Sequence, residues 1–398
     1  MKNKHRKFHK HENNNINENI NENEFIFNSN ENDEEKEPEW MTPETKNIKD
    51  INKRFHSEIT DYVNYITPQD ESLALRQKTF ELFKNIVQKY RPDWKVYLIG
   101  SFGQNLSTLY SDLDFLILFE NKYSTPEYEL KEMYNLMNIL KQENFCKNIR
   151  LAKARVPVIR AECMDTGISA DITINRENGC QAVEVVQKVL AKYRILRPSI
   201  MFLKILIQRF KLNDPHLGGM SSFLIFHLVY YFFIHKLKEK NINIESNDMP
   251  KLEENNVKKD ECSSDKDKNE NNKEEKDNIF NNNYKEDKKI QYEGNIGNFI
   301  MQFLQFYGYE FDYKKYSISL YGDNFGKLFL KEERKDMECS STISVEKIVE
   351  KGNDVGFSCY KYPIIVKLFQ TAYNFIKTEK EKNVCSLLQS LGFPSISK

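Results

Sequence analysis

The stretch Ile99–Phe119, IGSFGQNLSTLYSDLDFLILF, organises the rest of this chain. It follows an apolar strand that begins at Lys95, and its second half is another apolar strand that carries Asp112 and Asp114. Side chains two residues apart on a strand share a face, so the two carboxylates project together. Like charges held this close repel unless a cation lies between them. Oxygen ligands that open toward phosphate suit Mg²⁺, and the stretch therefore predicts a magnesium site.

Between these strands, Gly100 and Ser101 open a turn and a short helix. Glycine lets the backbone approach a ligand closely, and a serine at a helix start offers a hydroxyl beside free N–H groups, where phosphate binds well. A Gly-Ser pair or an Asp-x-Asp pair alone also fits a solvated strand end. The combination of strand, Gly-Ser, short spacer and Ser-Asp-Leu-Asp is much more specific.

The GSF and SDLDF segments resemble the nucleotidyltransferase motif of the DNA polymerase β superfamily. This resemblance implies a third carboxylate on a neighbouring strand. Ile168–Ile174 alternates in polarity and places Asp171 on the face opposite its isoleucines. By resemblance, Asp112, Asp114 and Asp171 are the catalytic residues and bind two Mg²⁺ (or Mn²⁺) ions. One ion would activate the attacking hydroxyl and the other would neutralise the triphosphate.

Composition limits the other function classes. The chain has 398 residues, enough for two domains, and carries 59 basic and 59 acidic side chains, so a nucleic acid must be bound by a local patch. The seven cysteines are scattered without Cys-x-x-Cys spacing, which does not favour zinc and suits a reducing compartment. The most apolar run, Phe223–Ile234, is shorter than the roughly 20 residues that span a bilayer. We expect a soluble intracellular protein without membrane contact.

Hydrophobic periodicity predicts an α+β chain. Before Asn178, helices alternate with strands, and after it the period becomes that of helices. The pattern predicts one strand within Ile149–Arg160, a further strand over Tyr316–Leu320 and a helix over Ile343–Val349. With the resemblance, we expect a polymerase-β-like nucleotidyltransferase domain with a mixed sheet, plus a mainly helical central domain.

Polar low-complexity sequence marks the expected boundaries. We expect the following divisions of the chain: a disordered tail (1–43), a helix that packs on the central domain (44–66), the catalytic domain (67–179), the central domain (180–380) with a disordered insertion (240–291), and a C-terminal tail (381–398).

Further segments narrow the resemblance. RFHSEITDYVNYITPQDE, INRENG, LKILIQRFKLN, HLGGMSSF and NDVG are similar, in this order, to segments of the TRAMP-type noncanonical poly(A) polymerases, over Arg54–Ile376. The resemblance implies a set of nucleotide-binding residues: Gly100, Ser101, Asn178, Gly179, Lys204, Ser222, Phe223, Glu350, Asn353 and Asp354.

Each carried-over role has a structural alternative. Asn178-Gly179 would touch the ribose, although an Asn-Gly pair is equally common in a plain turn. Lys204 would reach the triphosphate, or it is a lysine at the edge of the core. Gln208, one turn later, stands where uridylyl-adding relatives often have a second lysine. Ser222 would contact phosphate, and Phe223 would stack on the base or belong to the core.

The NDVG segment resembles the family's base-recognition loop. Relatives that select uracil often have histidine at the position of Asn353, and adenylating members have asparagine, so ATP is favoured over UTP. Two departures weaken this inference: Lys347-Ile348 replaces a common Asp-Pro, and Phe357 replaces a common arginine. Glu350 remains as a polar contact.

The resemblance implies a template-independent poly(A) polymerase of RNA surveillance that adds AMP from ATP to RNA 3′ ends. The alternatives are a terminal uridylyltransferase, a catalytically silent RNA-binding scaffold subunit and, more distantly, a small-molecule nucleotidyltransferase of the aminoglycoside type. The implied partners are RNA, a zinc-knuckle RNA-binding protein and an RNA helicase. The implied location is the nucleus, with the cytoplasm as the alternative.

Overall fold

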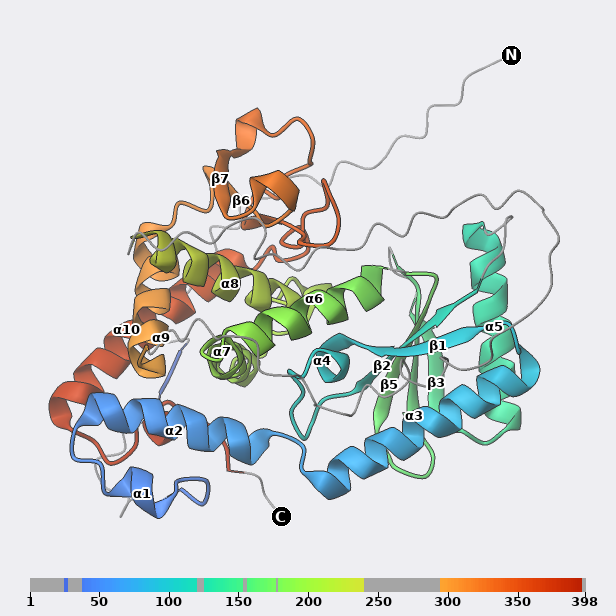
Figure 1. Cartoon of the computed structure of the whole chain (residues 1–398), viewed down its shortest axis with the longest axis horizontal. Coiled ribbons are helices and arrows are strands. Elements are labelled where there is room, and N and C mark those ends of the chain that lie inside the picture. Colours follow the sequence, from blue (N-terminus) through green and yellow to red (C-terminus); the bar gives the residue numbers. More distant parts are fainter. Residues whose placement is uncertain are drawn as a thin grey trace, which may run out of the picture.

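A computed structural model describes residues 25–27, 38–119, 125–152, 156–176, 178–239 and 294–395. Most of the predicted N-terminal tail, residues 1–24 and 28–37, and the predicted insertion 240–291 lie outside the described residues. Figure 1 shows a sheet with its helices beside a larger helical part, and α4 and α7 lie where the two parts meet.

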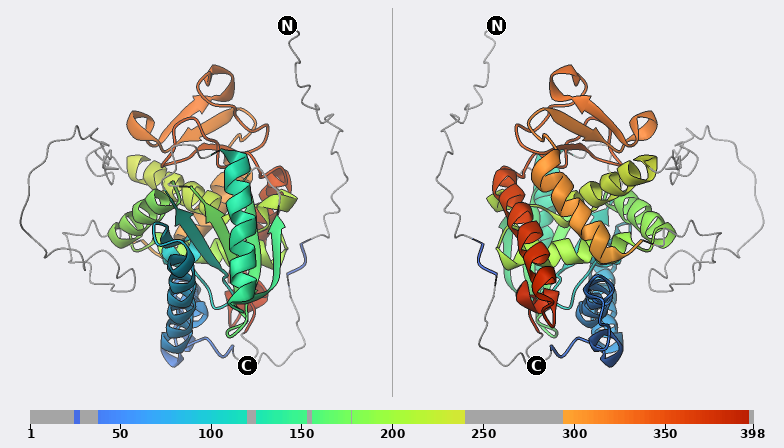
Figure 2. Two further views of the ribbon diagram at one scale, coloured as in Figure 1. Left: turned by 90° about the vertical axis from the view of Figure 1, so that its right-hand side faces the viewer. Right: turned by 90° about the vertical axis from the view of Figure 1, so that its left-hand side faces the viewer.

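The catalytic part is built on a five-stranded sheet in the order β1-β2-β5-β4-β3. Strands β2 and β5 are parallel and the other neighbours are antiparallel, so the predicted mixed sheet is confirmed. Figures 1 and 2 show α3 and α5 beside this sheet. The elements of this part are β1 (Lys95–Ile99), α4 (Gly100–Gly103), β2 (Leu113–Leu118), β3 (Cys146–Ala152), β4 (Val158–Cys163), β5 (Ser169–Ile174), α3 (Asp70–Tyr90) and α5 (Pro126–Gln142).

Aromatic stacking holds α3 on the sheet. Phe83 lies parallel to Phe115 of β2 with ring centroids 4.3 Å apart, and both side chains are fully buried. Phe80, one turn earlier on α3, also contacts Phe115. Since Phe115 alternates with Asp114 along β2, burial of the phenylalanine on this face directs the aspartate to the other face.

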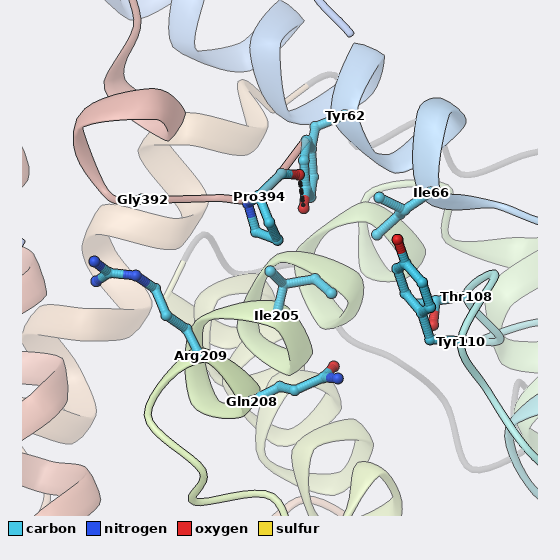
Figure 3. A pocket seen from close by; sticks show the side chains of 9 residues that line it. All are labelled: Tyr62, Ile66, Thr108, Tyr110, Ile205, Gln208, Arg209, Gly392 and Pro394. Atoms are coloured by element: carbon cyan, nitrogen blue, oxygen red, sulfur yellow. Dashed lines mark hydrogen bonds between the residues drawn. The ribbon is translucent and has the colours of Figure 1, made fainter. Parts of the chain in front are cut away.

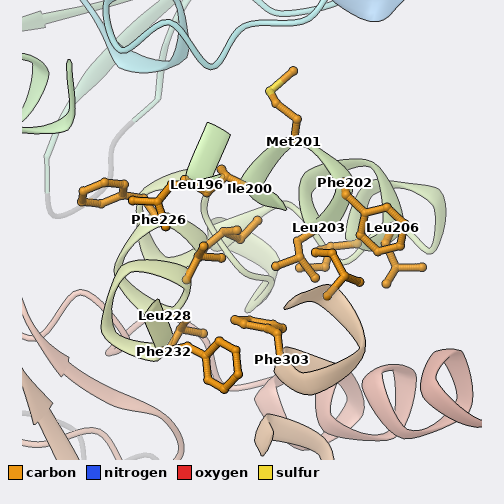
Figure 4. Close-up of a cluster of buried hydrophobic side chains, with 14 of the residues drawn as sticks. Leu196, Ile200, Met201, Phe202, Leu203, Leu206, Phe226, Leu228, Phe232 and Phe303 are labelled. Carbon is orange, nitrogen blue, oxygen red and sulfur yellow. The ribbon is translucent and has the colours of Figure 1, made fainter. Parts of the chain in front are cut away.

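The helical part surrounds α7 (Leu196–Arg209), in which every residue from Ser199 to Ile207 is buried. A helix that is apolar all round belongs in the middle of a core. Figure 4 shows its leucines and isoleucines packed against Phe226, Phe232 and Phe303. The surrounding helices are α2 (Ile51–Ile66), α6 (Asn178–Lys192), α8 (Ser222–Glu239), α9 (Ile296–Gln305) and α10 (Tyr362–Lys382), with short helical turns at Pro215–Leu217, Phe306–Glu310, Gly322–Asn324 and Lys331–Glu333.

A small sheet in the order β7-β6-β8 lies at one end of the helical part. It consists of β6 (Tyr316–Ser319), which was predicted, β7 (Lys327–Leu330) and β8 (Ser344–Glu346). The predicted helix over Ile343–Val349 is therefore wrong. Strand β8 pairs in parallel with β6, and the Ser344 and Ser317 hydroxyls share a buried hydrogen bond of 3.0 Å, a tertiary contact that periodicity cannot reveal.

The prediction of a single strand over Ile149–Arg160 is also wrong. The segment contains the end of β3 and the start of β4, which pair antiparallel. Pro157 lies immediately before β4, where its missing N–H removes no ladder hydrogen bond.

Both predicted tails contain ordered segments. Residues 25–27 place Phe25 and Phe27 against Phe210, and residues 38–43 lead into α1 (Pro43–Lys46). In the C-terminal segment, α11 (Leu387–Ser390) is anchored by Glu58 of α2. The carboxylate of Glu58 accepts hydrogen bonds from the Ser386 hydroxyl and the Leu388 N–H at 2.9 and 3.0 Å. The predicted disorder is thus corrected for residues 25–27 and 38–43, and the predicted C-terminal tail is corrected for residues 381–395. No helix within the described ranges is long and apolar enough to cross a membrane.

Candidate active site

Three carboxylates meet where β2 and β5 face the helical part. Asp114 of β2 lies directly opposite Asp171 of β5, and Asp112 precedes β2 by one residue. All three line one cleft of about 760 Å³, together with Arg150 and Arg160. The structure therefore brings the three predicted acids to one place.

Burial and neighbouring carboxylates raise the pKa values of Asp114 and Asp171. Burial, followed by the charges of Asp112 and Asp171, raises the pKa of Asp114 to about 7, although the Ser101 N–H opposes this by donating to its carboxylate. Burial and then Asp112 raise the pKa of Asp171, whereas Arg160, 3.6 Å away, lowers it. Mutual repulsion in a partly buried, all-oxygen cluster fits a hard divalent cation, and Mg²⁺ prefers this donor set.

The side chains do not yet form a closed metal site. Within the part of the chain that the structure describes, no three His, Cys, Asp or Glu side chains are grouped tightly enough to hold an ion. Asp114 accepts from the Ser101 N–H, and Asp171 faces Arg160.

Gly100 permits the close approach of the turn to Asp114. Its φ is +63°, in the left-handed region that favours glycine, and a Cβ added here would lie 1.8 Å from Oδ2 of Asp114. The backbone of the Gly-Ser turn therefore contacts the carboxylate directly. Gly100 and Ser101 therefore position the Asp114 carboxylate.

Lys204 reaches this site from α7. Its side chain is almost fully buried, and its Nζ donates a hydrogen bond to the carbonyl oxygen of Leu106 in the loop before β2. Burial lowers the pKa of Lys204 to about 8, while the charges of Asp112 and Asp114 oppose that shift. The predicted triphosphate lysine thus lies close to two of the three acids and joins the two parts of the chain.

Glu350 brings two further predicted residues together. Its carboxylate accepts hydrogen bonds from Lys347 and Asn353 in its own loop and from Asn178 at the start of α6. Burial raises the pKa of Glu350, but these three partners outweigh burial and lower it. The candidate base-recognition and ribose-contacting residues are therefore neighbours, although they are far apart in the sequence.

Two predicted nucleotide-binding residues, Asp354 and Gly179, have structural roles in the fold. The Asp354 carboxylate accepts hydrogen bonds from the backbone N–H groups of Ser340, Val345 and Gly356 at 2.8, 2.9 and 2.8 Å. Its acceptors are thereby occupied, so Asp354 shapes the loop that carries Asn353. Gly179, in the first turn of α6, packs against β1, where an added Cβ would be 3.2 Å from the side chain of Ile99. The glycine therefore permits close packing of α6 on the sheet.

Ser222 and Phe223 form the first turn of α8. The preceding Ser221 caps this helix, since its hydroxyl accepts from the Leu224 N–H at 3.1 Å. Phe223 is half-buried. Its ring packs nearly perpendicular to that of His227, with the ring centroids 4.4 Å apart. One side of the ring is thus fixed by packing, while part of it stays exposed.

His227 is a fully buried residue that the sequence did not single out. Its Nδ1 lies 2.7 Å from the carbonyl oxygen of Phe223, and its Nε2 accepts from the Ile348 N–H at 3.0 Å. Burial lowers the pKa of His227 to about 4, so the imidazole is neutral near pH 7. The neutral ring ties α8 to the loop that carries Glu350 and Asn353.

This histidine predicts acid sensitivity. As pH falls below 6.5, His227 becomes protonated in the unfolded chain, whereas in the folded chain it stays neutral until about pH 4. Protonation therefore favours the unfolded state, and the free energy of unfolding decreases. Between about pH 7 and pH 5 we expect a loss of about 2 kcal/mol in the free energy of unfolding from this residue. Urea unfolding at the two pH values measures the loss, which should shrink in His227→Phe. An equal loss in that variant would refute the assignment.

Comparison with known proteins finds two family models that match separate parts of the chain. Residues 55–190 match the sequence model of the central palm domain of mitochondrial-like poly(A) RNA polymerases, and residues 295–347 match that of Cid1 family poly A polymerases. In these two stretches the chain is similar to the noncanonical poly(A) polymerases. Poly(A) RNA polymerase protein 2 of Saccharomyces cerevisiae is 31% identical over 189 residues, which are 46% of this chain and 31% of that protein. The chain spans less than a third of the length of such curated relatives.

Solved structures show the same fold. The polymerase core of TRAMP, an RNA surveillance complex, superimposes with a TM-score of 0.65 at 21% identity, covering 88% of this chain and 94% of that one. A histidine-to-asparagine mutant of the Cid1 poly(U) polymerase, bound to MgATP, superimposes with a TM-score of 0.62 at 17% identity, covering 82% and 95%. The predicted polymerase-β-like architecture is confirmed.

Gln208 does not lie in the catalytic cleft. It lines a separate, mostly apolar cavity of about 300 Å³, with Tyr110 and Ile205 among the other lining residues. Figure 3 shows the cavity between α2, α7 and the C-terminal segment, where the Tyr62 hydroxyl donates to the Pro394 carbonyl oxygen at 3.1 Å. Gln208, one turn beyond Lys204 on α7, thus faces this separate cavity.

Sequence reasoning missed several residues that line the catalytic cleft: Asn148, Arg150, Arg160, Asn213 and His216. The first three belong to the β3–β4 hairpin, which was predicted as one strand. Without the correct pairing, no pattern could place them beside the acids.

Proposed function

We propose that this chain adds AMP from ATP to RNA 3′ ends without a template, by nucleotidyl transfer at Asp112, Asp114 and Asp171. The observation that carries the proposal is the direct pairing of Asp114 with Asp171, beside Asp112, in one cleft. The partial similarity to curated proteins named poly(A) RNA polymerases supports the same chemistry.

The three aspartates would hold Mg²⁺, two ions in our proposal, which when bound would assist deprotonation of the RNA 3′-hydroxyl and stabilise the leaving pyrophosphate. Lys204 would neutralise the triphosphate from α7, and the Ser101 and Ser222 hydroxyls would donate to its phosphates. Asp171 would accept the proton of the 3′-hydroxyl. Its raised pKa suits a base that must bind a proton transiently.

ATP is the favoured nucleotide because Asn353 can both donate to and accept from the adenine edge. Glu350 fixes the Asn353 side chain, and Asn178 on the same carboxylate would face the ribose. The MgATP complex of the Cid1 mutant, in which asparagine replaces histidine, supports this reading for a relative. The alternative is UTP, because Lys347, Ile348 and the half-exposed Phe357 depart from the adenylating pattern and weaken the inference of ATP.

Incubation of the full chain with a labelled oligoribonucleotide, Mg²⁺ and each nucleoside triphosphate separately tests the proposal. We expect extension with ATP, and we expect Asn353→His to shift preference toward UTP by about tenfold or more, because a mismatched buried polar group costs about 1–3 kcal/mol. Preferential extension of the wild type with UTP would favour the uridylyltransferase. No extension with any nucleotide would favour a silent scaffold.

RNA and partner proteins complete the proposal. The chain carries no net charge, so its own attraction to RNA is local. A TRAMP-like assembly, with a zinc-knuckle protein and a helicase acting in nuclear RNA surveillance, would supply the missing affinity. Tight RNA binding by the isolated chain at physiological salt would contradict this part.

A further inference from the structure

A row of four charged residues crosses the catalytic sheet. Asp114 of β2 lies opposite Asp171 of β5, Asp171 lies opposite Arg160 of β4, and Arg160 lies opposite Arg150 of β3. Residues directly opposite on adjacent strands project from the same face. The row therefore runs from two acids to two arginines on the face that lines the cleft.

A β-bulge puts the second arginine into this row. Lys147 pairs with Glu162, but the register shifts before Arg150, and the intervening Asn148 has a left-handed φ of +53°. Without the extra residue, the apolar Ile149 would lie opposite Arg160. Bulges near active sites commonly re-aim a side chain, and this one replaces an apolar side chain by a guanidinium.

The arginines still have hydrogen-bonding capacity. Arg160 lies 3.6 Å from Asp171, beyond hydrogen-bond distance, and its Nε is buried with no hydrogen-bond partner among the described residues. Arg150 is exposed to the cleft. Glu162, which also lines the cleft, is paired with Lys147 at 2.8 Å and accepts from the Asn148 amide at 3.0 Å.

We infer that Arg160 and Arg150 form a phosphate track that holds the last two phosphodiesters of the RNA 3′ end, with Arg160 next to the acids. This inference rests on the proposed function. Guanidinium groups bind phosphate in a bidentate manner, and strands about 4.8 Å apart set the two arginines in steps leading away from Asp171. The contacts read no base, so the product can move by one nucleotide after each addition.

Steady-state kinetics of the full chain test the track with primers of two, three and twelve nucleotides at saturating ATP. Arg160→Gln should lower kcat/KM for every primer by about tenfold. Arg150→Gln should lower it by about tenfold for the two longer primers and clearly less for the dinucleotide, which lacks a second phosphodiester. Arg150→Lys should retain part of the activity, because the charge remains.

The control is Lys78→Gln, which removes an exposed charge on α3, remote from the cleft residues. It should match the wild type, whereas Arg150→Gln should reduce the salt dependence of log(kcat/KM) for the longest primer by about 0.7 per lost phosphate contact. Two results would overturn the track. One is an equal loss of kcat/KM in Lys78→Gln and Arg150→Gln, and the other is a loss in Arg150→Gln that is the same for all three primers.

Anisotropy of the labelled twelve-nucleotide RNA separates this inference from the proposed function. If the wild type binds RNA but adds no nucleotide, the function fails, and weaker binding by Arg150→Gln than by Lys78→Gln still supports the track. If the wild type adds nucleotides and Arg150→Gln matches it on every primer, the function stands and the track fails.

Discussion

Replacement of Asp112 or Asp114 by alanine is expected to abolish nucleotide addition to RNA. Each change removes a carboxylate from the cluster that would hold the cations, and the loss should exceed the roughly 10- to 100-fold that removal of an outer-shell partner costs. Extension of a labelled oligoribonucleotide with ATP and Mg²⁺ measures the effect. Retained activity in either variant would refute the assignment of these acids.

The fold should survive these changes. Burial and repulsion from Asp112 and Asp171 already raise the pKa of Asp114, so its charge costs folding free energy. Asp114→Asn should therefore melt at the same or a higher temperature than the wild type while losing activity. Asp165→Asn, in the exposed turn between β4 and β5, is the matched control and should keep full activity. A lower melting temperature for Asp114→Asn would contradict this view.

Replacement of Gly100 by alanine should also inactivate the protein. The new Cβ would meet Oδ2 of Asp114 at 1.8 Å, so the carboxylate must move. A misplacement of about 1 Å in a reacting constellation can cost about 100-fold in rate. The left-handed backbone adds about 1–2 kcal/mol of strain for any residue with a Cβ. Melting temperature and RNA extension together measure the two effects.

Gly167→Ala separates the clash from the strain. Gly167 has a φ of +67°, close to that of Gly100, but a Cβ there would meet nothing within 4 Å. This variant should lose stability and keep its activity. If both alanine variants were equally active, the contact between Gly100 and Asp114 would not matter for function.

The central strands could be predicted because their information is local. Alternation along Leu113–Leu118 and Ile168–Ile174 decides which residues face the core, and the motif spacing links the two strands. The α3 boundaries, Asp70 and Tyr90, follow equally from periodicity and a preceding Pro68. The resemblance then implied that the strand carrying Asp171 lies next to the strand carrying Asp114, as it does in the structure.

Other features depend on tertiary contacts that no local pattern carries. The bulge at Asn148 interrupts the alternation along β3, so the end of this strand cannot be read from the sequence. The β8 residues Ser344–Glu346 form a strand by pairing with β6. Asp354 resembles a ligand-binding residue in sequence, yet three backbone N–H groups occupy its carboxylate. The role of such a residue depends on which donors the fold brings to it.

The central claim is that Asp112, Asp114 and Asp171 bind divalent cations together with a nucleotide. Calorimetric titration of Mn²⁺ into the full chain, with and without a non-hydrolysable ATP analogue, tests it most directly. We expect binding that depends on the analogue in the wild type and is lost in Asp112→Asn and Asp171→Asn, with unchanged melting curves. Equal Mn²⁺ binding by the wild type and these two variants would contradict the claim.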